Sequence, residues 1–166
     1  MEKEAKFVQK TMEDTRQLIV EKGFRLLKLV DVLNTDGISR TKFFSYFGGF
    51  HDLIELVLRH EILQRYKYIQ SRTKGIQEPS LLLKNIIAHR QQYISKNELL
   101  TRYYNEEKDL PRRFDGLKKA ISSLETSLIR QLIQPLTASK REYMYLKEII
   151  LKNKQYEVSK NYPTVI

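Results

Sequence analysis

The residues of this chain best suited to chemistry lie in one short stretch, Ser39 to Phe47. A helix turns by about 100° per residue, so Phe43 and Phe47 share one face and are expected in the core. The other side and the first turn carry Arg40, Thr41, Lys42, Phe44, Ser45 and Tyr46. The cations and hydroxyls of this set can bind phosphates and the edges of bases, and the set contains no acidic residue that would repel a phosphate. The pattern therefore favours nucleic-acid binding, although in an arbitrary helix the same charges would simply be solvated.

Two short helices around a tight turn must position this face. Leu29 and Leu33 belong to the buried stripe of the first helix, and Ser39 can cap the second. Gly37 suits the turn between them, because glycine adopts a positive φ at little cost. Such a pair, at about residues 27–47, is a helix-turn-helix, whose second helix lies in the major groove of DNA.

The rest of the chain is predicted to be helical as well. Apolar residues recur every three or four positions, and glycine and proline fall between these stretches. Helices are expected at about 8–22, 29–33, 39–47, 51–70, 79–93, 97–104, 111–135 and 139–158. No stretch resembles a strand, so the fold class is all-α. We expect an N-terminal three-helix DNA-binding domain at 1–50 and a helical regulatory and dimerisation domain at 51–166.

Composition limits the partners. The formal net charge is +10, which suits an anionic partner, but residues 111–166 carry eleven Lys/Arg against five Asp/Glu and hold most of the excess. The chain has no cysteine, which excludes disulfides and thiolate metal sites. It shows no signal peptide and no apolar run of about 18 residues. We therefore expect a cytoplasmic protein without a membrane partner.

The N-terminal third resembles the tetracycline-repressor (TetR) family of transcriptional regulators. The resemblance rests on Gly23-Phe24, on 30–33 (VDVL), on 36–47 (DGISRTKFFSYF) and on Asp52-Leu53, within about residues 8–60. The run YISKNELL at 93–100 is similar to the branch that resembles dihydroxyacetone-kinase regulators.

The resemblance implies a homodimer that binds a near-palindromic double-stranded DNA operator. It also implies a helical body that dimerises and holds a small-molecule effector, whose binding releases a repressor from DNA. The implied DNA-binding residues are Lys28, Ser39, Arg40, Thr41, Lys42, Phe44, Ser45 and Tyr46. Tyrosines of the body could line the effector pocket, because they pair an apolar ring with a hydrogen-bonding tip. The candidates are Tyr93, Tyr103, Tyr104 and Tyr143, and core packing is the competing interpretation.

The chain departs from the family pattern at three positions. Phe44 replaces a tyrosine and Phe50 replaces a lysine, both of which contact phosphate in the family. The capping threonine of the second helix is replaced by Leu27 or Lys28, which leaves that helix without an obvious cap. Many relatives also have one further C-terminal helix at the dimer interface, so the dimer geometry stays open. The alternative is a TetR-like interaction protein or co-activator that no longer binds an operator directly.

No enzyme signature is present. The sequence has no phosphate-binding Gly-rich loop and no Gly-x-Ser-x-Gly elbow. His51, His60 and His89 lack the spacing of metal ligands. We expect neither catalysis nor a metal or cofactor.

Overall fold

The computed structural model describes residues 1–134 and 139–152, and these contain helices and no strand. This confirms the all-α fold class. The helices are α1 (Glu2–Lys22), α2 (Leu29–Asp36), α3 (Arg40–Tyr46), α4 (Phe50–Thr73), α5 (Pro79–Ser95), α6 (Glu98–Glu106), α7 (Asp115–Ile133) and α8 (Lys140–Lys152). Two short 3₁₀ turns, η1 (Glu107–Asp109) and η2 (Arg112–Phe114), join α6 to α7. The part of the last predicted helix beyond residue 152 lies outside the described residues.

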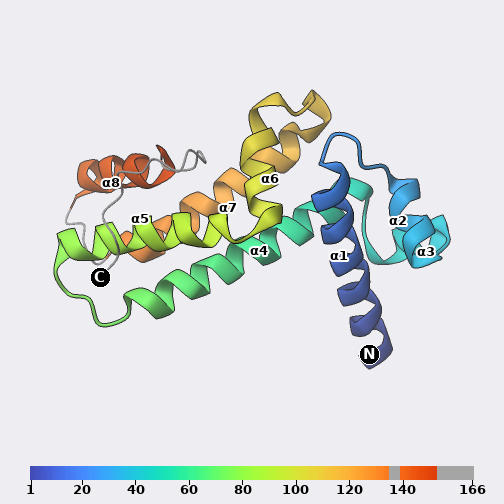
Figure 1. The fold of residues 1–166 in the computed structure, drawn as a ribbon, viewed down its shortest axis with the longest axis horizontal. Helices are drawn as coiled ribbons and strands as arrows, with labels where there is room; N and C mark the ends of the chain where they lie inside the picture. Colours follow the sequence, from blue (N-terminus) through green and yellow to red (C-terminus); the bar gives the residue numbers. More distant parts are fainter. Residues whose placement is uncertain (135–138, 153–166) are drawn as a thin grey trace.

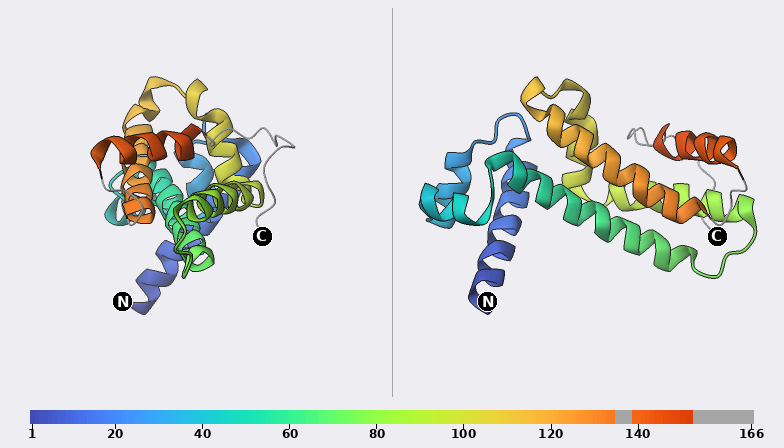
Figure 2. Two further views of the ribbon diagram at one scale, coloured as in Figure 1. Left: turned by 90° about the vertical axis from the view of Figure 1, so that its left-hand side faces the viewer. Right: turned by 180° about the vertical axis from the view of Figure 1, so that it is seen from behind.

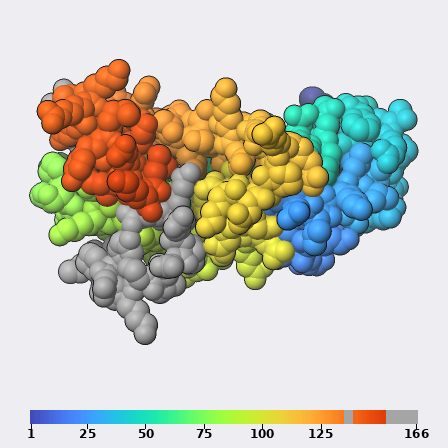
Figure 3. Space-filling view, turned by 90° about the horizontal axis from the view of Figure 1, so that it is seen from above, coloured from blue at the N-terminus to red at the C-terminus, as the bar shows by residue number. Residues whose placement is uncertain are grey.

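The molecule is elongated (Figure 1). The helices α1, α2 and α3, which we call the head, lie at one end, and the long helices α4, α5 and α7 form the body. Helix α8 lies across the far end of the body (Figure 2). The space-filling view places the head and α8 at opposite ends of the molecule, with α6 and the start of α7 between them (Figure 3).

One helix start differs from the sequence prediction. Helix α1 begins at Glu2 rather than near Val8, with Glu2 and Glu4 in its first turn, where the helix dipole favours acids. At the start of α2, Lys28 makes no side-chain cap hydrogen bond, as expected. The backbone N–H of Lys28 instead donates to Oδ2 of Asp31, 2.8 Å away, which is the second half of a capping box.

Two apolar clusters hold the helices together. The larger one runs from the head into the body and includes Phe24, Phe43, Leu53 and Tyr103. It crosses the expected domain boundary near residue 50, where α4 begins. The smaller cluster lies at the far end, where Ile86 of α5 and Ile133 of α7 pack with Ile150 of α8. The head therefore rests on a continuous core, and α8 closes a separate one.

None of the helices in the described ranges, 1–134 and 139–152, is long and apolar enough to cross a membrane.

Candidate nucleic-acid interface

Helix α3 is anchored by its phenylalanines. Phe43 is fully buried and Phe47 is 5% exposed, and their ring centroids are 5.2 Å apart. This confirms the prediction that both rings point into the core. The burial of one face fixes which residues of α3 reach solvent.

The opposite side of α3 is exposed, as the helical spacing predicted. Arg40, Thr41, Lys42 and Ser45 are all exposed, and so is Lys28, at the start of α2. Phe44 and Tyr46 lie at the margins, with 47% and 38% of their surfaces exposed. Helix α3 contains no acidic residue. The structure thus brings the residues from Lys28 to Tyr46 to one end of the molecule, at the outer edge of the head (Figure 1).

Two hydroxyls of this set are already engaged. Oγ of Ser39 accepts the backbone N–H of Lys42 at 3.2 Å and so caps α3. The hydroxyl of Ser45 donates to the carbonyl of Lys42 at 2.6 Å. A hydroxyl proton can serve only one acceptor, so Ser45 must give up this bond before it can donate to a phosphate. Arg40, Thr41 and Lys42 are the better placed donors.

Helix α1 supports the outer end of α3. The ring of Phe7 lies 4.7 Å from that of Tyr46, centroid to centroid, and Nζ of Lys42 lies 4.5 Å above the Phe7 ring. Such cation–π contacts are worth about 0.5–1 kcal/mol at exposed sites. They hold Lys42 and Tyr46 in place without neutralising the charge. The contacts of Phe7 were not predicted from the sequence, because α1 was expected to begin after this residue.

The turn between α2 and α3 follows its predicted chemistry. Gly37 has a φ of 63°, in the left-handed region, and nothing lies within 4 Å of the position that a Cβ would occupy there.

Phe50, the residue that replaces a lysine in the family pattern, is only partly exposed and packs against the larger cluster. Phe50 therefore points inward and offers no charge to a phosphate.

The head is linked to the body through α6. Gly23 ends α1 with a φ of 82°, and a Cβ there would lie 2.7 Å from side-chain atoms of both Arg102 and Glu106. Nearby, Arg16 of α1 and Asn97, the cap of α6, donate to the two carboxylate oxygens of Glu61 on α4. A shift of α6 would therefore change its contacts with the end of α1.

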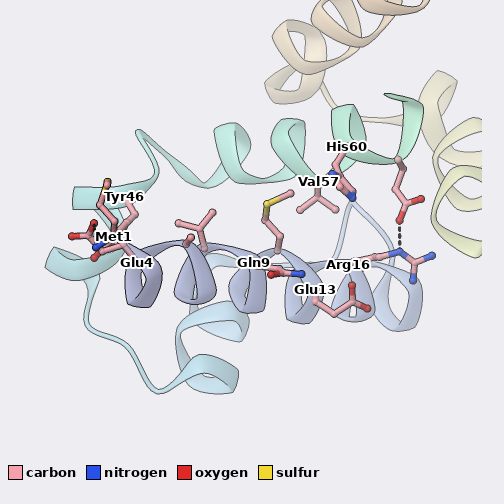
Figure 4. A pocket seen from close by; sticks show the side chains of 12 residues that line it. Met1, Glu4, Gln9, Glu13, Arg16, Tyr46, Val57 and His60 are labelled. Atoms are coloured by element: carbon pink, nitrogen blue, oxygen red, sulfur yellow. Dashed lines mark hydrogen bonds and ion pairs between the residues drawn. The ribbon is translucent and has the colours of Figure 1, made fainter. Parts of the chain in front are cut away.

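A groove of about 750 Å³ lies between α1 and α4 (Figure 4). Val8, Met12 and Val57 are among its apolar lining residues, and Tyr46 lies at one end. Glu4 and Glu13 also line it. Acidic residues repel phosphates, so this groove suits a protein segment better than DNA.

The four predicted pocket tyrosines are spread over different contacts, although Tyr103 and Tyr104 lie edge-on with ring centroids 5.4 Å apart. Tyr103 is 1% exposed and lies edge-on to Phe24 in the larger cluster, and Tyr93 packs beside Tyr68. Tyr143 belongs to the smaller cluster under α8. Tyr104 also reaches a buried polar group of the body that was not predicted from the sequence.

That group is a buried cluster of three charged side chains and one phenol. Nη2 of Arg65 lies 2.7 Å from Oε1 of Glu125, and Nη2 of Arg90 lies 3.3 Å from the same oxygen. The hydroxyl of Tyr104 donates to that oxygen and accepts from Nη1 of Arg65. The residues come from α4, α5, α6 and α7, and nothing in their local sequence signals that they meet.

The histidines do not form a metal site. No group of three or more His, Cys, Asp or Glu in the described ranges could hold a metal ion. His51 instead packs on Phe114, with ring centroids 4.7 Å apart. Burial, and then the charge of Arg113, lower the pKa of His51. A neutral ring against the core is a poor phosphate ligand.

No family model, curated protein or solved structure matches this chain.

Proposed function

We propose that this chain is a DNA-binding transcriptional regulator of the TetR type, acting as a homodimer on an operator. The observation that carries the proposal is the exposed face of α3: Arg40, Thr41 and Lys42 project from a helix that Phe43 and Phe47 fix in the core. A guanidinium can bind guanine through two hydrogen bonds, and an ammonium can bind phosphate. The helix is short, but the first residues of a recognition helix make most of the base contacts.

The connections of α6 support the proposal of regulation by a small molecule. Tyr104 of α6 reaches the buried charged cluster, Tyr103 lies on Phe24, and Asn97 at the start of α6 binds Glu61. A ligand that moves α6 would change how α1 and the rest of the head are seated. We propose that such an effector releases a repressor from its operator.

Selection from a pool of random DNA duplexes tests the proposal without knowledge of the operator. Wild-type protein should enrich one sequence with near-palindromic symmetry. The double variant Arg40→Ala, Lys42→Ala should enrich none. The control Lys84→Ala, Lys119→Ala removes two exposed charges from the body and should enrich the same sequence as the wild type. Enrichment by the α3 variant, or none by the wild type, would overturn the proposal.

The groove between α1 and α4 favours one second candidate, an interaction protein that no longer binds DNA directly. Its lining combines apolar residues with Glu4 and Glu13, which suits a basic amphipathic segment of another protein. The inward position of Phe50 agrees with this candidate, since one phosphate contact of the family pattern is lost. Sequence-selective DNA binding that depends on Arg40 and Lys42 would exclude it.

A further inference from the structure

The buried cluster of the body carries an excess positive charge. Arg65, Arg90 and Glu125 are 4%, 3% and 2% exposed, so two guanidiniums share one carboxylate away from water. Burial raises the pKa of Tyr104, so its phenol stays neutral and adds no negative charge. Leaving a buried charge uncompensated costs several kcal/mol. Counted over residues 1–134 and 139–152, the two guanidiniums and the one carboxylate leave the cluster one negative charge short of neutrality.

Of the two arginines, Arg90 is the one whose charge is less well compensated. Arg65 donates to both Tyr104 and Glu125, and these two partners outweigh its burial and raise its pKa. Arg90 donates from Nη2 to Glu125 over 3.3 Å and lies 5.7 Å above the ring of Tyr104, but its buried Nη1 has no hydrogen-bond partner in the described part of the chain. Burial and the neighbouring charge of Arg65 lower the pKa of Arg90. A donor and a charge are thus left for another acceptor.

A small cavity lies beside this donor. Its volume is about 20 Å³, and Arg65 and Arg90 both line it. A cavity of this size holds about one water molecule. Glu125 lines it as well, on the side where it meets the two guanidiniums. The remaining wall is largely apolar and comes from α4, α5, α7 and α8, through Ile62, Ile69, Ile86, Leu128, Ile129 and Ile150. Helix α8 contributes Ile150 to this wall and packs chiefly on α7. A ligand larger than one water molecule must therefore displace this helix.

We propose that Arg65 and Arg90 bind the carboxylate of a small aliphatic acid, whose carbon chain displaces α8 and lies among α4, α5, α7 and α8. A carboxylate matches the planar donors of a guanidinium, and its single charge neutralises the cluster. A phosphate dianion would reverse the imbalance instead of removing it. The apolar wall accepts a hydrocarbon chain and disfavours a polar body. The site's role as the effector site rests on the proposed function, whereas the binding itself does not.

Thermal unfolding of the full chain tests the site. Acetate, butyrate and hexanoate are compared with their neutral amides, with chloride and with phosphate, at equal sodium concentration. At a hundred times its Kd, a ligand of the folded state should raise Tm by about 5–10 °C for a chain of this size. We expect one or more of the carboxylates to raise Tm, and the amides, chloride and phosphate to leave it nearly unchanged. Equal shifts with chloride, phosphate or the amides, or no shift with any carboxylate, would overturn the proposal.

Variants separate binding from a structural role. Arg90→Met removes the charge that lacks a full partner, so Tm without ligand should stay level or rise while the response to carboxylates disappears. Arg90→Lys keeps the charge but loses the planar fork, and its response should weaken. Arg141→Met, an exposed position on α8, should respond as the wild type does. A large fall in the Tm of ligand-free Arg90→Met, or a retained response, would show that Arg90 is only a structural partner of Glu125.

The test uses no DNA, so its result is independent of the proposed function. Carboxylate binding without operator binding would support the proposed site and contradict the proposed function. Operator binding without any carboxylate response would support the proposed function and contradict the proposed site.

Discussion

Arg40 on α3 and Arg90 on α5 are the same side chain in opposite settings. Arg40 is exposed and solvated, so it can wait for a partner at little cost in stability. Arg90 is 3% exposed and shares one carboxylate with Arg65, so its missing partner weakens the folded state. The comparison teaches that a surface cation must be tested by what it binds, whereas a buried cation can also be tested by what its removal does to stability.

The largest expected effect comes from removing the one acid of the buried cluster. Glu125→Gln leaves Arg65 and Arg90 facing each other without a counter-charge, and we expect the free energy of unfolding to fall by about 3–5 kcal/mol. Urea denaturation measures this change. Glu148→Gln, which removes an exposed acid on α8, is the control and should change stability by less than about 1 kcal/mol. A small effect of Glu125→Gln would mean that the cluster is not a buried charge network.

The two faces of α3 should respond differently to truncation. Phe43→Ala removes a fully buried ring and should lower the free energy of unfolding by about 3–5 kcal/mol. Phe44→Ala removes a ring that is 47% exposed, so a loss of less than about half of that is expected. Chemical denaturation of both variants measures the two losses in the free energy of unfolding. Equal losses would contradict the assignment of Phe44 to the exposed side.

Two glycines separate the effect of backbone strain from that of close packing: Gly23 lies at the joint between head and body, and Gly37 lies in the turn between α2 and α3. Gly23 and Gly37 both have positive φ, so alanine costs about 1 kcal/mol or more at either. At Gly23 the new Cβ would also press on Arg102 and Glu106, so Gly23→Ala should destabilise more than Gly37→Ala. Comparison of their denaturation midpoints checks this order. The reverse order would show that α6 does not hold the end of α1.

A smaller effect is expected from pH. Burial, followed by nearby positive charge, lowers the pKa of His51 from 6.5, and burial is also the main cause of the lowered pKa of His89. Below 6.5 the unfolded chain then binds more protons than the folded one, so stability present at higher pH is lost as the pH falls through this value. The free energy of unfolding should drop between about pH 7.5 and pH 5.5. The double variant His51→Gln, His89→Gln should flatten that slope, and an unchanged slope would refute the account.

How far the sequence could predict this molecule depended on the range of the interactions involved. Periodicity along single helices predicted the all-α fold and the inward faces of Phe43 and Phe47, because both are local properties. The cluster of Arg65, Arg90 and Glu125 could not be predicted, since its members are far apart in the sequence and meet only through packing. The grouping of the four tyrosines could not be predicted for the same reason, since Tyr103 and Tyr143 lie in different clusters.

The most direct test of the central claim, that α3 reads DNA, is the affinity of wild type and Arg40→Ala for the selected duplex and for a scrambled one, at about 50 and 200 mM salt. We predict that the wild type prefers the selected duplex, and that Arg40→Ala loses about 1–3 kcal/mol of this preference. Lys42→Ala should weaken binding to both duplexes and reduce the salt slope by about one unit. Equal, salt-sensitive binding of both duplexes by the wild type, unchanged in either variant, would contradict the account.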